Sequence, residues 1–153
     1  MRSKFLLIAA IVLSMACNRS ANDPSSKRII FDARGQEVIT SFANNEQRTM
    51  SILFGNSPAQ QAALDGTSKH KPGEVFILAT WEQVAHPRWY GTYINGRIKT
   101  VETITVLPSL HSGMNIDYKL KGSEPKDVNG NIISRRERIS FILNQEPSVF
   151  PSR

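Results

Sequence analysis

Residues 98–107 read Ile98-Lys-Thr-Val-Glu-Thr-Ile-Thr-Val-Leu107, and this stretch decides the fold of the chain. Its side chains alternate with the period of two that is typical of a β-strand with one buried face. The more apolar face is expected to carry Ile98, Thr100, Glu102, Ile104 and Val106. A strand with one such face needs neighbouring strands and a covering layer.

Further strands are predicted on both sides of this stretch. Residues 74–81 form an almost continuous apolar run, which indicates a central strand covered on both faces. Residues 37–42 and 49–54 predict a hairpin that turns at Asn44 and Asn45. Residues 114–120 alternate as a half-buried strand does.

Two helices are predicted from their capping signals. Ser57 is expected as the N-cap of the first, with Pro58 in its first position and an end before Gly66. Residues 134–137 form a capping box that opens a second helix through Asn144. The fold class is therefore predicted as α+β: a single domain with an antiparallel β-sheet of about five strands and two flanking helices.

The beginning of the chain has the features of an export signal. Arg2 and Lys4 precede an apolar run from Phe5 to Ala16 that is too short to span a bilayer as a helix. We therefore expect residues 1–16 to be a signal peptide. Cys17, the sole cysteine, would then stand at the mature N-terminus as a lipid attachment site, although the match to a bacterial lipoprotein motif is imperfect.

Residues 17–27 are expected to form a flexible tether, because they are rich in Ser, Asn, Asp and Pro, and residues 28–153 to form the folded domain. The expected location is the periplasmic face of a bacterial membrane, with a soluble secreted or periplasmic protein as the alternative. The sequence does not distinguish the inner from the outer membrane.

The charge of the chain argues against nucleic acid as a partner. Two of the 19 Lys and Arg residues and none of the 13 Asp and Glu residues lie in the signal, so the mature chain is only mildly basic. Its basic residues are scattered and are not interleaved with stacking aromatic side chains. The membrane, through the N-terminal lipid, is the expected partner.

Glu102 is the candidate catalytic residue, because a carboxylate on an apolar strand face is desolvated in a way that suits general acid or base chemistry. The alternative is that an arginine or a backbone donor satisfies it. A candidate pocket is predicted from residues that the strands and the following turn could bring together: Trp81, His86, Arg88, Trp89 and Glu102. The competing interpretation is that Trp89 or Tyr90 fills one end of the core.

The sequence contains no metal or nucleophile motif of high specificity. His70, His86 and His111 are far apart and form no pair with the spacing of metal ligands, so they are expected to be surface or loop residues. No metal site is predicted.

An ordered succession of short motifs resembles the cytochrome P-460 family. The motifs are residues 49–56 before an alanine-rich helix, 72–81, 87–91 and 101–102, and the ending 138–145 is similar to the tail of shorter relatives. The resemblance covers about Glu37 to Pro151. It implies a periplasmic β-rich domain with flanking helices, a possible homodimer, and, in the true cytochromes, a covalent c-type haem that oxidises small nitrogen compounds.

The chain departs from this family where the haem would be attached. A c-type haem needs C-x-x-C-H, and this chain has one cysteine; Leu78 stands where the cross-linking lysine is expected. We therefore expect a non-catalytic binding or structural module without covalent haem, rather than an enzyme, and a small-molecule ligand that the sequence does not identify. The alternative is a protein that holds haem non-covalently through His70, His86 or His111, or an oxidoreductase acting on small nitrogen compounds.

Overall fold

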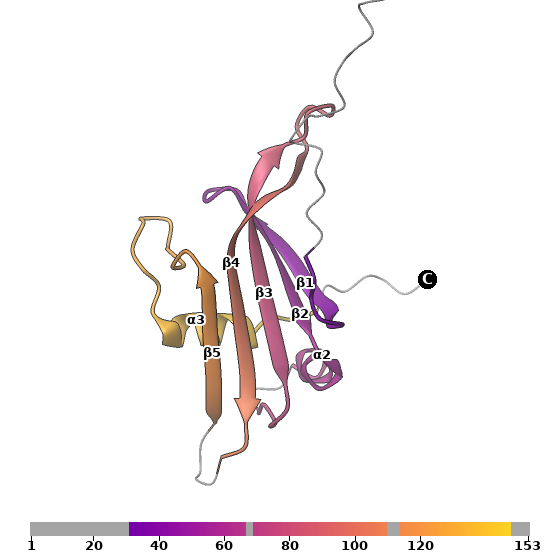
Figure 1. The fold of residues 1–153 in the computed structure, drawn as a ribbon, viewed down its shortest axis with the longest axis vertical. Helices are drawn as coiled ribbons and strands as arrows, with labels where there is room; N and C mark the ends of the chain where they lie inside the picture. The colour runs from indigo at the N-terminus through magenta and orange to yellow at the C-terminus, as the bar shows by residue number, and fades with distance from the viewer. Residues whose placement is uncertain (1–30, 67–68, 110–113, 148–153) are drawn as a thin grey trace, which may run out of the picture.

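A computed structural model describes residues 31–66, 69–109 and 114–147 of the chain. These residues form a five-stranded antiparallel sheet and two helices, as predicted, and the strands follow one another across the sheet in sequence order (Figure 1). The strands are β1 (Glu37–Asn44), β2 (Thr49–Gly55), β3 (Val75–Ala85), β4 (Tyr93–Leu107) and β5 (Asn115–Gly122). The helices are α2 (Ser57–Leu64) and α3 (Arg135–Leu143).

The predicted register of the 98–107 strand is confirmed from Thr100 to Val106 but not at Ile98, which is half-buried and pairs with Trp81 beyond a register shift. Thr100, Glu102, Ile104 and Val106 are buried on one face of β4, while the residues between them are half-buried. Strand β3 is the central strand, as its apolar run predicts, and Leu78 in it lies between Leu53 of β2 and Glu102 of β4. Its neighbours Ile77 and Ala79 are buried on the opposite face.

The two helices lie on the same face of the sheet rather than flanking it on two sides. One apolar cluster joins side chains of α2 and α3 to those of the strands, and α3 runs behind the sheet in the view of Figure 1. The buried members of this cluster are Ile39, Leu53, Ala59, Ala63, Phe76, Leu78, Ile104 and Ile142. This cluster is the core between the helices and the sheet.

The cap of α2 differs from the prediction by one residue. Asn56, not Ser57, is the N-cap, and its side chain accepts a hydrogen bond from the Ala59 N–H at 3.2 Å. The Asn56 carboxamide also accepts from the Val75 N–H at 3.1 Å, so it ties the helix to β3 as well. The predicted capping box of α3 is confirmed, with Ser134 and Glu137 as its two members.

Strands β3 and β4 are longer than predicted and form an arm that extends beyond the sheet. We call residues 83–97 the β3–β4 arm. Pairing with β2 ends at Glu82, with one more hydrogen bond from the Gln83 N–H to the Arg48 carbonyl at 2.8 Å, and pairing with β5 begins at Thr100. Beyond these points β3 and β4 pair only with each other. Register shifts on both sides of Trp81 mark where the arm leaves the sheet.

Candidate functional site

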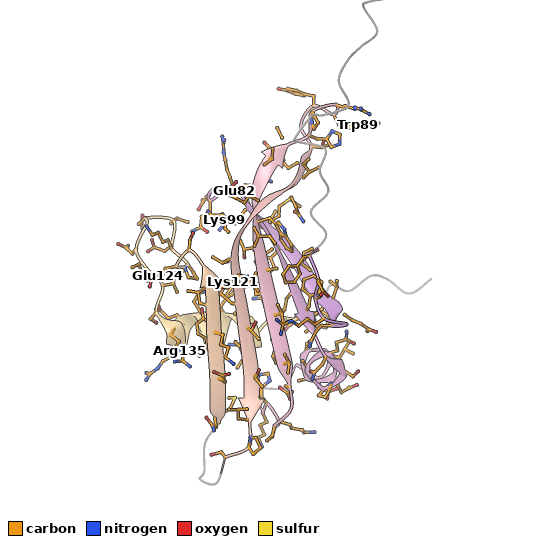
Figure 2. All side chains as sticks on the ribbon, viewed as in Figure 1. Glu82, Trp89, Lys99, Lys121, Glu124 and Arg135 are labelled. Carbon is orange, nitrogen blue, oxygen red and sulfur yellow. The ribbon has the colours of Figure 1, made fainter. Side chains whose placement is uncertain are left out.

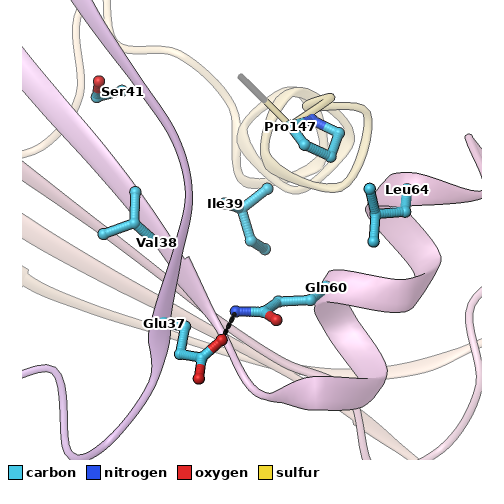
Figure 3. Close-up of a pocket in the computed structure, with 7 residues that line it drawn as sticks. All are labelled: Glu37, Val38, Ile39, Ser41, Gln60, Leu64 and Pro147. Carbon is cyan, nitrogen blue, oxygen red and sulfur yellow. Dashed lines mark hydrogen bonds between the residues drawn. The ribbon is translucent and has the colours of Figure 1, made fainter. Parts of the chain in front are cut away.

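A groove with a volume of about 370 Å³ lies between the edge strand β1, helix α2 and the end of the described chain (Figure 3). Such a volume is at the lower end of the range for small-molecule sites. Its lining residues are Glu37, Val38, Ile39, Ser41, Gln60, Leu64 and Pro147. We call this feature the β1–α2 groove.

The walls of the β1–α2 groove are mainly apolar, and two of its polar residues, Glu37 and Gln60, meet at one end, away from Ser41 (Figure 3). Gln60 Nε2 donates to Glu37 Oε2 at 3.0 Å, which joins α2 to β1 across the groove (Figure 3). Ile39 is buried in the floor, whereas Leu64 is 67% exposed at the rim. The groove therefore offers an apolar surface beside a carboxylate that is fixed in position.

Glu102 does not line this groove; it is enclosed between the sheet and α3. Arg138 of α3 binds the carboxylate with two hydrogen bonds, from Nε to Oε1 at 2.9 Å and from Nη2 to Oε2 at 2.5 Å. Tyr118 of β5 donates its hydroxyl to Oε1 at 2.7 Å. The Glu102 side chain is 0% exposed, so the arrangement joins β4, β5 and α3 in the interior.

This geometry matches the alternative in which an arginine satisfies Glu102. Both carboxylate oxygens are occupied by protein donors, and the Arg138 guanidinium lies over the Phe141 ring at 4.9 Å. A substrate would have to displace this packing to reach the carboxylate. The arrangement therefore supports a structural contribution by Glu102 to the attachment of α3.

The Tyr118 hydroxyl gives this buried group a measurable signature. Burial of the hydroxyl is the main cause that raises the pKa of Tyr118 above its ordinary value of about 10, and the hydrogen bond that it donates to Glu102 is the second. The folded protein then keeps a proton that the unfolded chain loses, so the free energy of unfolding should decrease as the pH rises above about 10. Unfolding experiments across this alkaline range should show a smaller decrease for Tyr118→Phe. Identical decreases in the two proteins would contradict the assignment.

The other residues of the predicted pocket do not gather around Glu102. Trp81 pairs in register with Met50, and its side chain is buried on the opposite face of the sheet, where it meets Phe31 with ring centroids 5.8 Å apart. His86, Arg88 and Trp89 lie at the tip of the β3–β4 arm, far from the helix-covered core, as Figure 2 shows for Trp89. The competing interpretation is wrong as well, because Trp89 is 67% exposed and Tyr90 is completely exposed.

His70 is more buried than its loop position predicts. Its side chain is 4% exposed, and Nδ1 lies 2.6 Å from Oε2 of Glu74. The other carboxylate oxygen of Glu74 accepts the Lys71 N–H at 2.7 Å, and the His70 ring packs edge-on against Phe76. His86 lies in the arm, and His111 lies outside the described residues.

No sequence pattern predicts the β1–α2 groove. Its residues come from a strand, a helix and the segment after α3, and only the packing of these elements brings them together. The exposed tip of the arm carries a partial signal, because residues 86–91 combine two aromatic side chains with Arg88. The length of the arm was not predicted.

No protein-family model matches the sequence, and no curated protein matches it. Within the described ranges, no helix is long and apolar enough to cross a membrane. The same ranges contain no group of three or more His, Cys, Asp or Glu side chains placed to hold a metal ion.

Proposed function

We propose that the protein is an exported, lipid-anchored binding module that binds a small ligand in the β1–α2 groove. The export signal and Cys17 support the location, and the groove, with its apolar walls and fixed carboxylate, is the observation that carries the binding function. Residues 28–153 would form one domain on a scaffold similar to that of the cytochrome P-460 family.

Two features support this choice of scaffold and the absence of covalent haem. The motifs that resemble the P-460 family fall on successive parts of one sheet: residues 49–56 cover β2 and the α2 cap, and residues 72–81 include most of β3. A single cysteine cannot provide the two thioether bonds of a c-type haem. A scaffold without its attached cofactor is expected to act through binding, since a fold alone does not transfer an activity.

The groove favours a ligand with a short apolar body and a cationic or hydrogen-donating end. Val38, Leu64 and Pro147 would contact the apolar part. Glu37, whose Oε2 is held by Gln60, would receive the donor. This orientation follows from the position of the polar pair at one end of the groove (Figure 3).

A titration with n-hexylammonium, followed by amide chemical shifts, tests the proposal. We expect shifts around the groove, several-fold weaker binding to Glu37→Gln, and no binding to Leu64→Trp, whose larger side chain fills the rim. Glu46→Gln, at an exposed site in the β1–β2 turn, is the control and should bind as the wild type does. Equal binding of hexanoate, or shifts spread over the whole surface, would refute the assignment.

One observation bears on the alternative of non-covalent haem binding. The buried His70 imidazole is oriented by Glu74, an arrangement also found behind ligand histidines. The surroundings fit haem poorly, because the ring is packed against Phe76, and neither His70 nor His86, the two histidines that the structure describes, lines the β1–α2 groove. A Soret band in protein purified after haem supplementation, abolished by one of His70→Ala, His86→Ala or His111→Ala, would favour this alternative.

A further inference from the structure

The β3–β4 arm exposes apolar side chains on a part of the fold that does not need them for its core. The arm extends beyond the end of the sheet (Figure 1), and beyond Gln83, whose N–H donates to the Arg48 carbonyl at the base, the two strands of the arm pair with each other and with no other strand among the described residues. A two-stranded ribbon on its own is only marginally stable in water. Its exposed apolar side chains therefore indicate a surface that contacts something else.

The tip of the arm presents its aromatic side chains on an ordered turn. The Trp89 carbonyl accepts the Thr92 hydroxyl at 2.8 Å, and the His86 N–H donates to the Thr92 carbonyl at 2.9 Å. The Trp89 ring lies edge-on to His86, with centroids 6.4 Å apart, yet remains 67% exposed. Tyr90 is completely exposed, and Tyr93 is 53% exposed. The turn therefore fixes the tip backbone and leaves the large rings in solvent.

The charge of the arm has one sign. Residues 83–101 contain no Asp or Glu, and they include Arg88, Arg97 and Lys99. Arg97 pairs at 2.8 Å with Glu82, which lies at the base of the arm (Figure 2). At the tip, Arg88 is exposed and has no ion-pair partner among the described residues. The tip thus combines Trp, Tyr and an uncompensated cation.

This combination matches the interface of an anionic bilayer. Trp and Tyr are enriched at the headgroup level, where their rings meet both apolar and polar surroundings, and Arg is attracted to anionic lipid phosphates. Residues 18–30 separate Cys17 from the described domain, and fully extended they would span up to about 50 Å. A domain tethered at Cys17 would remain close enough to a membrane for the arm to reach it.

We propose that the tip of the β3–β4 arm enters the headgroup region of an anionic membrane, with Trp89 and Tyr90 as anchors and Arg88 on a lipid phosphate. This second contact rests on the proposed tether. It would fix the orientation of the domain above the bilayer, which a flexible tether alone cannot do.

The two tryptophans of the chain make the contact directly measurable. Trp81 is 2% exposed and serves as an internal reference, whereas Trp89 is at the tip. Purified exported protein is mixed with phosphatidylglycerol vesicles whose acyl chains carry bromine, which quenches nearby tryptophan. We expect substantial quenching in the wild type and none in Trp89→Phe, where Trp81 is the sole emitter. Arg88→Gln should lose more than half of the quenching, and Val128→Ser, at an exposed apolar site in the loop before α3, should lose none.

Several results would overturn the proposal. If the protein binds the vesicles, as shown by flotation, but its tryptophan emission is not quenched, then the arm stays in water. Equal quenching in phosphatidylcholine vesicles would refute the preference for anionic lipid. Protection of Trp89 from iodide on raising the protein concentration without lipid would assign the arm to a second copy of the chain. Mass spectrometry of the N-terminal peptide tests the lipid on Cys17 separately, since added vesicles report on the arm whether or not that lipid is present.

Discussion

Replacing Arg138 by methionine is expected to lower the free energy of unfolding by about 3–5 kcal/mol, because the change leaves the buried Glu102 carboxylate without its cation. The Glu102 side chain is 0% exposed and that of Arg138 is 13% exposed, so water cannot easily replace the guanidinium. Methionine retains most of the apolar stem, which limits the loss of packing. Denaturant unfolding followed by circular dichroism measures the effect.

The double variant Glu102→Leu with Arg138→Met separates the loss of a partner from the net contribution of the pair. We expect it to recover most of the stability, to within about 1–2 kcal/mol of the wild type, because removing both charges also removes their desolvation cost. Arg97→Met is the matched control, since its pair with Glu82 is exposed, and it should change stability little. Equal losses in Arg138→Met and Arg97→Met would mean that Glu102 is hydrated in solution.

Replacing Gly122 by alanine should destabilise the fold by about 3 kcal/mol, because two independent obstacles act at this position. Gly122 ends β5 with φ +105°, which L residues rarely adopt. A Cβ atom there would lie 2.1 Å from the Lys99 carbonyl oxygen. That carbonyl also accepts the Ser123 N–H at 3.1 Å, so moving it away would break a hydrogen bond.

Gly130→Ala is the control that separates the clash with the Lys99 carbonyl from the effect of positive φ. Gly130 also has positive φ, +85°, but a Cβ atom there meets no heavy atom within 4 Å. Gly130→Ala should lower the free energy of unfolding by about 1–2 kcal/mol, which is the effect of an L residue at positive φ alone. If thermal unfolding gave the two variants the same loss, then the end of β5 relaxes around a methyl group and the close approach to Lys99 is not a constraint.

The local patterns in the sequence predict the strands of the sheet but not which side chains meet on each of its faces. The alternation of residues 98–107 placed Glu102 on the buried face because the period of a strand is a local property. Its partner Arg138 is 36 residues further along the chain, on a helix that packs on the sheet through Ile139, Ile142 and Leu143. The identity of the partner therefore depends on tertiary structure.

The residues of the predicted pocket around Glu102 do not lie together, for a related reason. Trp81 and Glu102 are both buried, but they lie on opposite faces of the sheet. Whether residues after Trp81 return towards the core or continue outward depends on the register shifts beside it, which carry no clear sequence signature. The α2 cap moved by one residue because Asn56 and Ser57 are both good N-caps, and only Asn56 also reaches β3.

The strand order β1-β2-β3-β4-β5 has a consequence for the order of folding. Each strand pairs with its neighbour in sequence, so the sheet can grow strand by strand from the N-terminal end, and the longest connection, between β2 and β3, contains α2. Pairing between sequence neighbours favours rapid folding. Glu102, however, enters the sheet with β4, before α3 has been added. Its carboxylate acquires the Arg138 guanidinium only when the last helix docks. Completion of the core therefore waits for the C-terminal element: in a chain that ends before α3, water can solvate the Glu102 carboxylate, but the apolar side chains that Ile142 covers on the same face of the sheet also stay in water.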